Sequence, residues 1–293
     1  MSFINRHIIN IISVLAVCVI SSMLLEACNL TDSARLKEED YREQGIALMQ
    51  AGKYNEAATM LQMGLDQSVG FVTDLDVDIC YYRAAALFAA GDTDEALAVY
   101  DNIIDYDEKD WRAYYLRGTV YLLSADMTNA VLDYDTAISL DEKDADLYIQ
   151  IYENIKETDL NKAQEYLDKG AEAGDDDPCA MGYIYYLKGN TDSALTLLQD
   201  AADENNPRAC YYLGQIYIIL GNYTDALNIV NKGLYAASAD ASGSFLKYLK
   251  WLQVVCYEYT GDFERAKSLI SDYVELYPED PLAVRENTFL QTR

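Results

Sequence analysis

The chain has 293 residues and a formal net charge of −27, because 49 Asp and Glu residues outnumber 22 Lys and Arg residues. A surface this acidic repels phosphate backbones and anionic lipids, so nucleic acid is not an expected partner. The single histidine, His7, lies in the N-terminal segment, and a chain that lost this segment would have no imidazole. Since imidazole is the commonest general base and metal ligand, we predict no catalysis, no metal site and no cofactor.

The first distinctive segment, residues 8–25, carries no charge. As a helix at about 1.5 Å per residue it would reach roughly 27 Å, so length alone does not separate a signal sequence from a membrane anchor. The residues that follow, Leu25-Glu26-Ala27-Cys28, resemble the lipobox of bacterial lipoproteins, although Glu26 stands where a small or apolar residue is usual. In that family a leucine three places before the cysteine directs lipid attachment and cleavage.

This resemblance implies that residues 1–27 are a lipoprotein signal peptide, and that Cys28 carries the lipid. Residues 28–37 would then hold the lipidated cysteine, a short tether and the start of the first helix. An uncleaved anchor helix remains the alternative. Both place residues 29 onward outside the cytoplasm, at the extracytoplasmic side of the cell membrane.

A six-residue turn signature ending on alanine appears seven times along the chain, for example as Gly221-Asn222-Tyr223-Thr224-Asp225-Ala226. Steps of 39, 34, 33, 31, 32 and 40 residues between its alanines are typical of stacked two-helix units. Glycine can end the first helix in the left-handed conformation, and Asp, Asn or Thr beside it can cap the second. The seven alanines, each expected against the partner helix, are Ala57, Ala96, Ala130, Ala163, Ala194, Ala226 and Ala266.

Three further positions recur around this hinge. The small residues of the first helix are Gly45, Ala84, Gly118, Gly182 and Gly214, whereas Tyr152 and Val254 break the pattern. The aromatics one turn later are Tyr121, Tyr185, Tyr217 and Tyr257. The bulky residues four places after the alanine are Leu61, Tyr100, Tyr134, Leu167, Leu198, Val230 and Ile270. Together these positions resemble the consensus of the tetratricopeptide repeat family.

The resemblance implies an all-α, right-handed α-solenoid of about seven helix-turn-helix units. We expect the units at residues 38–71, 77–110, 111–144, 145–174, 175–206, 207–240 and 247–280, which together make an array over 38–280. Residues 281–293 are expected to form a short capping helix, with Leu282 and Phe289 covering the last unit.

Apart from histidine, the acidic residues and the cysteines are the side chains that could form a functional site. Asp74, Asp76 and Asp78 alternate like the start of a calcium loop, but its glycine and glutamate places are not matched, so a solvated turn with a helix cap is favoured. No Asp or Glu lies in an apolar run that would raise its pKa, so no acid/base pair is expected. Cys80, Cys179, Cys210 and Cys256 are expected as buried thiols, with a Cys179–Cys210 bridge left open as an alternative.

In the tetratricopeptide family the first helix of each unit lines a concave groove. The residues at the groove positions here are Arg42, Tyr81, Phe88, Arg112, Tyr115, Leu122, Tyr183, Tyr186, Arg208, Tyr211, Ile218, Tyr248, Trp251 and Tyr259. This set is aromatic and sparsely basic, and it lacks the Lys and Asn residues by which some members clamp a C-terminal carboxylate.

We therefore expect a non-catalytic, lipid-anchored extracytoplasmic scaffold that binds a protein or peptide of the cell envelope in this groove. The alternative is a module that binds cell-wall glycan or peptidoglycan, with Tyr115, Tyr211 and Trp251 as stacking platforms for sugar rings.

Overall fold

A computed structural model describes residues 33–239, 245–278 and 280–292, and all regular structure within them is helical. The described part of the first helix covers residues 33–50. It is followed by α2 (Tyr54–Leu65), α3 (Asp74–Ala90), α4 (Thr93–Tyr106), α5 (Trp111–Leu123), α6 (Met127–Leu140), α7 (Ala145–Ile155), α8 (Leu160–Ala173), α9 (Pro178–Leu187), α10 (Thr191–Asp203), α11 (Pro207–Ile219), α12 (Tyr223–Ala239), α13 (Leu246–Thr260), α14 (Phe263–Leu276) and α15 (Pro281–Leu290). The expected all-α solenoid class is confirmed.

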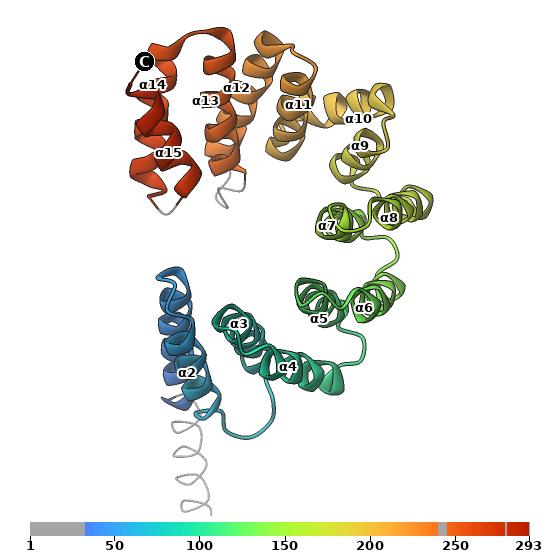
Figure 1. Cartoon of the computed structure of the whole chain (residues 1–293), viewed down its shortest axis with the longest axis vertical. Coiled ribbons are helices and arrows are strands. Elements are labelled where there is room, and N and C mark those ends of the chain that lie inside the picture. Colours follow the sequence, from blue (N-terminus) through green and yellow to red (C-terminus); the bar gives the residue numbers. More distant parts are fainter. Residues whose placement is uncertain (1–32, 240–244, 279, 293) are drawn as a thin grey trace, which may run out of the picture. The chain divides into compact units, whose positions relative to one another are not determined.

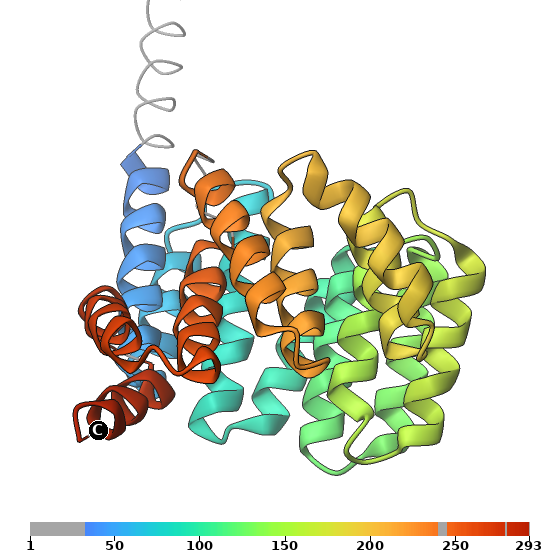
Figure 2. The same cartoon turned by 90° about the horizontal axis from the view of Figure 1, so that it is seen from above.

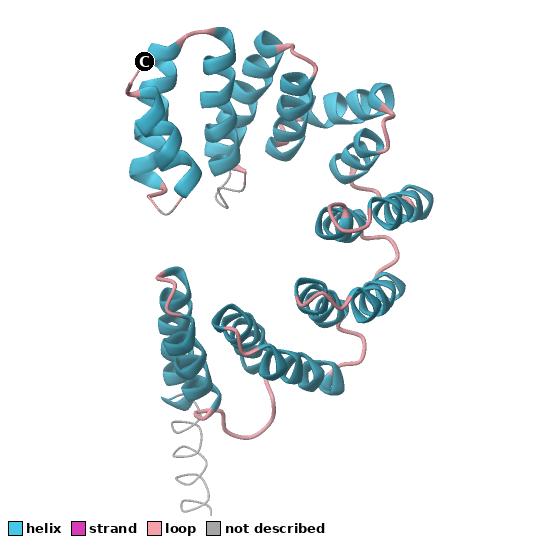
Figure 3. Ribbon diagram, in the orientation of Figure 1, coloured by secondary structure: helices cyan, strands magenta, loops and turns pink. Residues whose placement is uncertain are grey.

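The helices form consecutive antiparallel hairpins, each joined by a tight turn (Figures 1 and 3). They group into two compact units, of which unit 1 ends at Asp141 and unit 2 starts at Glu142. Unit 1 contains the hairpins 33–50/α2, α3/α4 and α5/α6, and unit 2 contains α7/α8, α9/α10, α11/α12 and α13/α14, followed by α15. Within a hairpin the two helices run side by side, as Figure 2 shows from above.

The hinge signature acts as the sequence predicts. Every second helix of a hairpin begins at the third residue of its signature, so that the closing alanine falls in the first turn of that helix. All seven of these alanines have no exposed surface. The turn itself needs the left-handed conformation, and Gly221 adopts it with φ of 79°. In the third hairpin Ala125 has to take the same conformation, with φ of 65°.

The two recurring positions that flank the hinge contact each other. A methyl group built on Gly182 of α9 would lie 2.7 Å from Leu198 Cγ of α10, closer than real contacts of that kind. In the hairpin of α7 and α8, where Tyr152 replaces the small residue, a glycine of the second helix allows the approach instead, because Gly170 lies against Tyr148. The close helix approach is therefore kept while its glycine moves to the partner helix.

The last helix differs from the prediction. Leu282 and Phe289 of α15 are 58% and 46% exposed, whereas Ala283 and Leu290 are buried against the core that contains Ile270. Both pairs are seven residues apart, so spacing alone does not choose between them. The small Ala283 lets α15 approach α14 closely, and the bulkier pair is left toward solvent.

The predicted signal peptide at 1–27 and the predicted lipid site at Cys28 lie outside the described residues. Among the residues that the structure does describe, no helix is both long enough and apolar enough to span a bilayer.

Candidate partner-binding surface

The predicted groove residues all lie on the first helices of hairpins, and none of them is fully buried. Arg112, Tyr248 and Tyr259 are exposed, and the other eleven are half-buried. The structure brings eight of the fourteen together in two separate groups, one in each unit, and leaves the other six outside both groups.

The larger group is in unit 2 and consists of rings from α9, α11 and the start of α13. Tyr183 and Tyr212 stack with centroids 4.3 Å apart and an interplanar angle of 9°. Tyr186 continues the group at 6.1 Å from Tyr183, and Tyr211 contacts Tyr248 at 5.5 Å. We call the whole set the aromatic surface, and its members are Tyr183, Tyr186, Tyr211, Tyr212, Phe245 and Tyr248.

Two members of the aromatic surface were missed from the sequence. Tyr212 directly follows the predicted Tyr211 in the sequence, and this adjacency was the only feature that could have indicated it. Phe245 precedes α13 in the left-handed conformation, with φ of 65°. A bulky residue rarely adopts this conformation. Its ring contacts Tyr211, Tyr212 and Tyr248, and these contacts hold it there.

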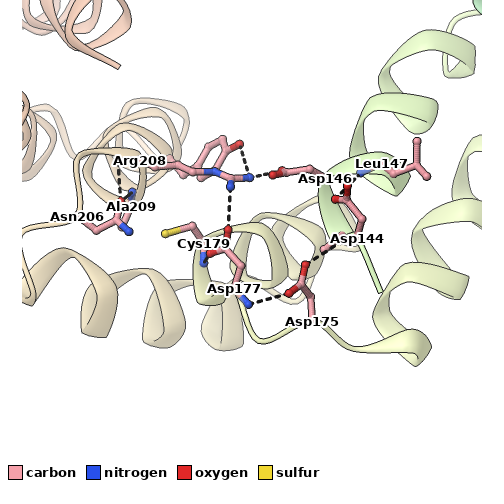
Figure 4. A network of polar contacts seen from close by, with 11 residues as sticks. Asp144, Asp146, Leu147, Asp175, Asp177, Cys179, Asn206, Arg208 and Ala209 are labelled. Atoms are coloured by element: carbon pink, nitrogen blue, oxygen red, sulfur yellow. Dashed lines mark hydrogen bonds and ion pairs between the residues drawn. The ribbon is translucent and has the colours of Figure 1, made fainter. Parts of the chain in front are cut away.

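Arg208 joins the aromatic surface to two neighbouring hairpins (Figure 4). Its Nη1 donates to Asp177 Oδ2 at 2.8 Å, its Nη2 donates to Asp146, and its guanidinium lies 5.4 Å from the centre of the Tyr212 ring. Burial alone would lower the pKa of Arg208, but Tyr212 and Asp146 outweigh it and the pKa is raised. One side chain of α11 thus connects α11 to α7 and α9.

The surroundings of Arg208 are acidic. Asp177 also caps α9 by accepting from the Cys179 amide at 2.8 Å. Asp175 accepts from the Ala145 amide at 3.0 Å and from the Asp177 amide at 2.9 Å, and Asp144 accepts from the Leu147 amide at 3.1 Å. Figure 4 shows Asp146 and Asp177 at the guanidinium and Asp144 and Asp175 beyond them. The edge of the aromatic surface therefore carries more negative than positive charge.

The smaller group lies in unit 1, around a cavity of about 280 Å³ that contains the predicted Tyr81 and Arg112. Tyr81 donates its hydroxyl to Asp110 Oδ2 at 2.6 Å, and Arg112 Nε donates to Asp110 Oδ1 at 3.2 Å. Asp78 and Asp107 also line the cavity. Burial and the hydrogen bond to Asp110 raise the pKa of Tyr81, which keeps its hydroxyl protonated.

Arg42 is also paired with an aspartate and lies over a tyrosine. Its Nε donates to Asp78, and its guanidinium lies 5.1 Å from the centre of the Tyr82 ring. All three arginines at the predicted groove positions are therefore ion-paired within the chain. The pairs of Arg42 and Arg208 connect different hairpins, whereas that of Arg112 is local, and in all three cases aspartates already satisfy the charge.

The remaining predicted residues pack inside their own unit, and three of them contact another aromatic ring of their own hairpin or of the preceding one. Tyr115 lies 5.8 Å from Tyr134, Trp251 lies 5.8 Å from Tyr273, and Tyr259 stacks on Tyr223 at 4.6 Å. Phe88 packs against the core of unit 1 and Ile218 against the core of unit 2. Leu122 is half-buried in α5.

Comparison with known proteins identifies the family to which these helical hairpins belong. The tetratricopeptide repeat family model matches residues 42–101 and 81–145, and a model described as anaphase-promoting complex, cyclosome, subunit 3 matches residues 125–233. This chain is a tetratricopeptide repeat protein. The fold of this family is that of a protein–protein interaction scaffold, and its members are generally non-catalytic.

Two solved structures illustrate the tetratricopeptide fold of this chain. A tetratricopeptide repeat protein from Parabacteroides merdae has a TM-score of 0.52 and 15% identity, with 88% of this chain and 100% of that chain covered. Yeast Tom70 has a TM-score of 0.58 and 17% identity, with 90% of this chain and 59% of that chain covered. No curated protein matches the sequence significantly.

One feature of this tetratricopeptide array contradicts the sequence prediction about acidic residues. Glu38 in the first helix is 4% exposed and lies against Asp76, which is 6% exposed. Burial, with the charge of Asp76, raises the pKa of Glu38 to about 7. The prediction failed because the neighbours of Glu38 in the sequence are charged. Its burial comes from the packing of α3 against the first helix.

Asp76 has a structural role of its own. It accepts from the backbone amide and from the hydroxyl of Thr73, both at 2.7 Å, which makes a capping box at the start of α3. The explanation of the aspartate triplet as a solvated turn with a helix cap is thus confirmed for the cap at Asp76, but Asp76 is buried and not solvated. Within the described residues, no group of three or more His, Cys, Asp or Glu side chains could hold a metal ion.

The four cysteines of the array are free thiols, so the bridge left open between Cys179 and Cys210 is not formed. Cys179, Cys210 and Cys256 are buried, whereas Cys80 is half-buried. Burial raises the pKa of Cys179 to about 12 and that of Cys210 to about 11. Thiols protonated to this extent are poor nucleophiles.

Proposed function

We propose that this tetratricopeptide protein is a lipid-anchored scaffold on the extracytoplasmic side of the cell membrane. It binds a protein or peptide of the cell envelope and performs no catalysis. The lipobox-like Leu25-Glu26-Ala27-Cys28 supports the anchor, and the repeat fold supports the scaffold. The observation that carries the binding proposal is the aromatic surface across three successive first helices, α9, α11 and α13.

Rings of this kind suit a binding surface. Tyrosine offers a large contact area at a low cost in side-chain entropy, and it is enriched at the centres of protein interfaces. Tyr248 is the accessible member, with 54% of its surface exposed. The half-buried rings behind it are held by one another, so little ordering is needed when a partner arrives.

Charge determines the chemistry of the partner. Arg208 is shared between two aspartates, and Arg112 lies in a cavity lined by Asp78, Asp107 and Asp110. Both surfaces therefore favour basic side chains and repel a C-terminal carboxylate. A Lys or Arg side chain can also lie over a tyrosine face and gain cation–π attraction. We propose that the partner segment is basic and apolar, and the net charge of −27 steers it toward the chain.

Peptide binding by the full chain tests this proposal. The probes are two synthetic peptides of equal length, one of Lys and Leu and one of Glu and Leu, with affinity measured by fluorescence anisotropy. We expect the basic peptide to bind and Tyr248→Ala to weaken it by at least about fivefold, or ~1 kcal/mol. Tyr235→Ala is the matched control, because Tyr235 is 81% exposed on α12, outside the aromatic surface.

Equal affinity for the acidic peptide would overturn the charge argument, and no effect of Tyr248→Ala would overturn the surface itself. Sedimentation of the chain with purified cell wall, lost on Trp251→Ala, would instead favour the glycan-binding alternative.

The anchor has a separate test. Cys28→Ser should release or misplace the protein if the cysteine carries the lipid, because stable anchoring needs more than one attached acyl chain or signal. Unchanged membrane retention of Cys28→Ser would favour an uncleaved N-terminal helix.

A further inference from the structure

The loop between α2 and α3 exposes apolar side chains to a degree unusual for this protein. Within residues 68–73, Val69 is 59% exposed, Phe71 is 94% exposed and Val72 is 52% exposed. Phe71 is the most exposed large hydrophobic residue of the described chain. Single exposed apolar residues are common, but three in one six-residue loop form a patch of the kind that marks an interaction site.

The loop has no charged residue, since its sequence is Ser-Val-Gly-Phe-Val-Thr. Gly70 takes φ of 100°, a conformation that residues with a side chain rarely adopt, and it makes the sharp turn between Val69 and Phe71. The loop is also fixed at its end, because Thr73 forms the capping box with Asp76. A fixed turn that presents Phe71 outward is thus built into unit 1.

The loop lies beside the beginning of the first helix. Ala34, Arg35 and Glu38 from that helix line one cavity of about 310 Å³ together with Ser68 and Val69 from the loop. In Figure 1 the connection from α2 to α3 runs at the end of unit 1 where the described chain starts. Leu36, in the same first turn of the helix, is 67% exposed.

The length of the chain before this helix determines what the loop can reach. Five residue steps separate Cys28 from residue 33, and at most about 3.3–3.6 Å per residue gives a reach of roughly 17 Å. A lipid on Cys28 therefore keeps the start of the first helix, and the loop beside it, within about half a bilayer thickness of the membrane surface. An uncleaved anchor helix ending near Leu25 would leave eight residue steps before residue 33, a reach of at most roughly 26–29 Å.

We infer that loop 68–73 inserts Phe71, with Val69 and Val72, into the membrane surface to which the chain is anchored. This inference rests on the proposed N-terminal anchoring. Apolar side chains of an anchored protein bury into the boundary between headgroups and acyl chains, and this contact adds to the lipid as a second attachment. The net charge of −27 repels anionic headgroups, so the contact is apolar and works on zwitterionic lipid. Two attachments fix the orientation of unit 1 at the membrane, which the N-terminal anchor alone would leave free.

Fluorescence of the full lipidated chain in phosphatidylcholine vesicles tests the inference. Phe71→Trp places a reporter in the loop, and vesicles with brominated acyl chains quench tryptophan that enters the bilayer. We expect the emission added by Phe71→Trp to fall by at least about twofold in brominated vesicles, with the same fall at low and high salt. Leu123→Trp is the matched control, because Leu123 is 66% exposed at the C-terminal end of α5 in the same unit, away from the loop. Its added emission should stay unquenched.

Two failures are distinguishable. If the chain stays with the vesicles but the Phe71→Trp emission is unquenched, the loop does not insert and the inference is wrong while the anchor stands. If the chain with an intact Cys28 does not stay with the vesicles, the anchoring fails and the inference falls with it.

Discussion

The carboxyl group of Glu38 lies against the carboxylate of Asp76, and both side chains are buried between the first helix and α3. Thr73 and Ser68 donate to Asp76, and these hydrogen bonds lower the pKa of Asp76 although its burial opposes them. Asp76 therefore stays ionised and Glu38 holds the proton. The contact between these two acidic groups, which belong to the first two hairpins of unit 1, therefore depends on that proton.

The contact of Glu38 with Asp76 predicts that the free energy of unfolding decreases as the pH rises from 4.5 to about 7. The pKa of Glu38 is about 7 in the folded chain and ordinarily 4.5, so between these values the folded state binds more protons than the unfolded state. The free energy of unfolding therefore decreases above pH 4.5, and the decrease is complete above pH 7. Glu38→Gln keeps a donor for Asp76 without this decrease, so we expect it to stabilise the chain by roughly 3 kcal/mol at pH 8 and by little at pH 4.

Thermal unfolding followed by circular dichroism from pH 4 to pH 8 measures this difference. Glu43→Gln is the control, because the side chain of Glu43 is 70% exposed and the change removes one negative charge at the surface of the same helix. A gain for Glu38→Gln that is equal at both ends of the pH range would contradict the shared proton.

The repeats could be read from the sequence because their signals are local. The hinge glycine, the buried alanine such as Ala226, and the pairing of Gly182 with Leu198 depend on residues within one hairpin, where spacing alone determines contacts. None of the predicted groove residues is fully buried, and their role as a binding face stays a prediction.

The contacts between hairpins could not be read in this way. Arg208 was predicted as a groove residue, but its bonds reach Asp177 and Asp146, which are 31 and 62 residues away. Glu38 and Asp76 lie in different hairpins, and Phe245 joins the aromatic surface through an unusual backbone conformation. Such contacts depend on the packing angle between hairpins, which the repeat consensus does not specify.

Ala125 gives a prediction about the hinge. It occupies the left-handed position, with φ of 65°, where five of the other hinges have glycine. This conformation costs a residue with a side chain about 1–2 kcal/mol, and part of that is offset because glycine is freer in the unfolded chain. We expect Ala125→Gly to stabilise the chain by roughly 1 kcal/mol, measured as a higher midpoint of thermal unfolding. Ala85→Gly, at an exposed site inside α3, should destabilise it by about 0.5–1 kcal/mol. Effects of the same sign at both sites would rule out the strain at Ala125.

Gly182 gives a prediction about the close approach of α9 and α10. An added methyl group would lie 2.7 Å from Leu198 Cγ and 3.0 Å from its Cδ2, so the helices must separate or Leu198 must change rotamer. We expect Gly182→Ala to lower stability by about 1–3 kcal/mol. The same change in a Leu198→Ala background should cost much less, because the clashing atoms are gone. Equal costs in the two backgrounds would show that the contact does not limit packing.

Arg208 gives a prediction about the connection between hairpins. Its side chain is 18% exposed, and Arg208→Met would keep the apolar stem while leaving Asp146 and Asp177 without their cation. Because these carboxylates are partly exposed, the cost lies below that of a fully buried pair, and we expect a loss of roughly 2 kcal/mol. Hydrogen exchange should locate the loss, with faster exchange in α9 and α11 and unchanged exchange in α3. Arg35→Met, which removes a 74% exposed pairing with Glu39, should change stability by less than about 0.5 kcal/mol. If the two variants lose the same small amount, Arg208 does not hold the three hairpins together, and its carboxylate neighbours would be free to meet a basic partner directly.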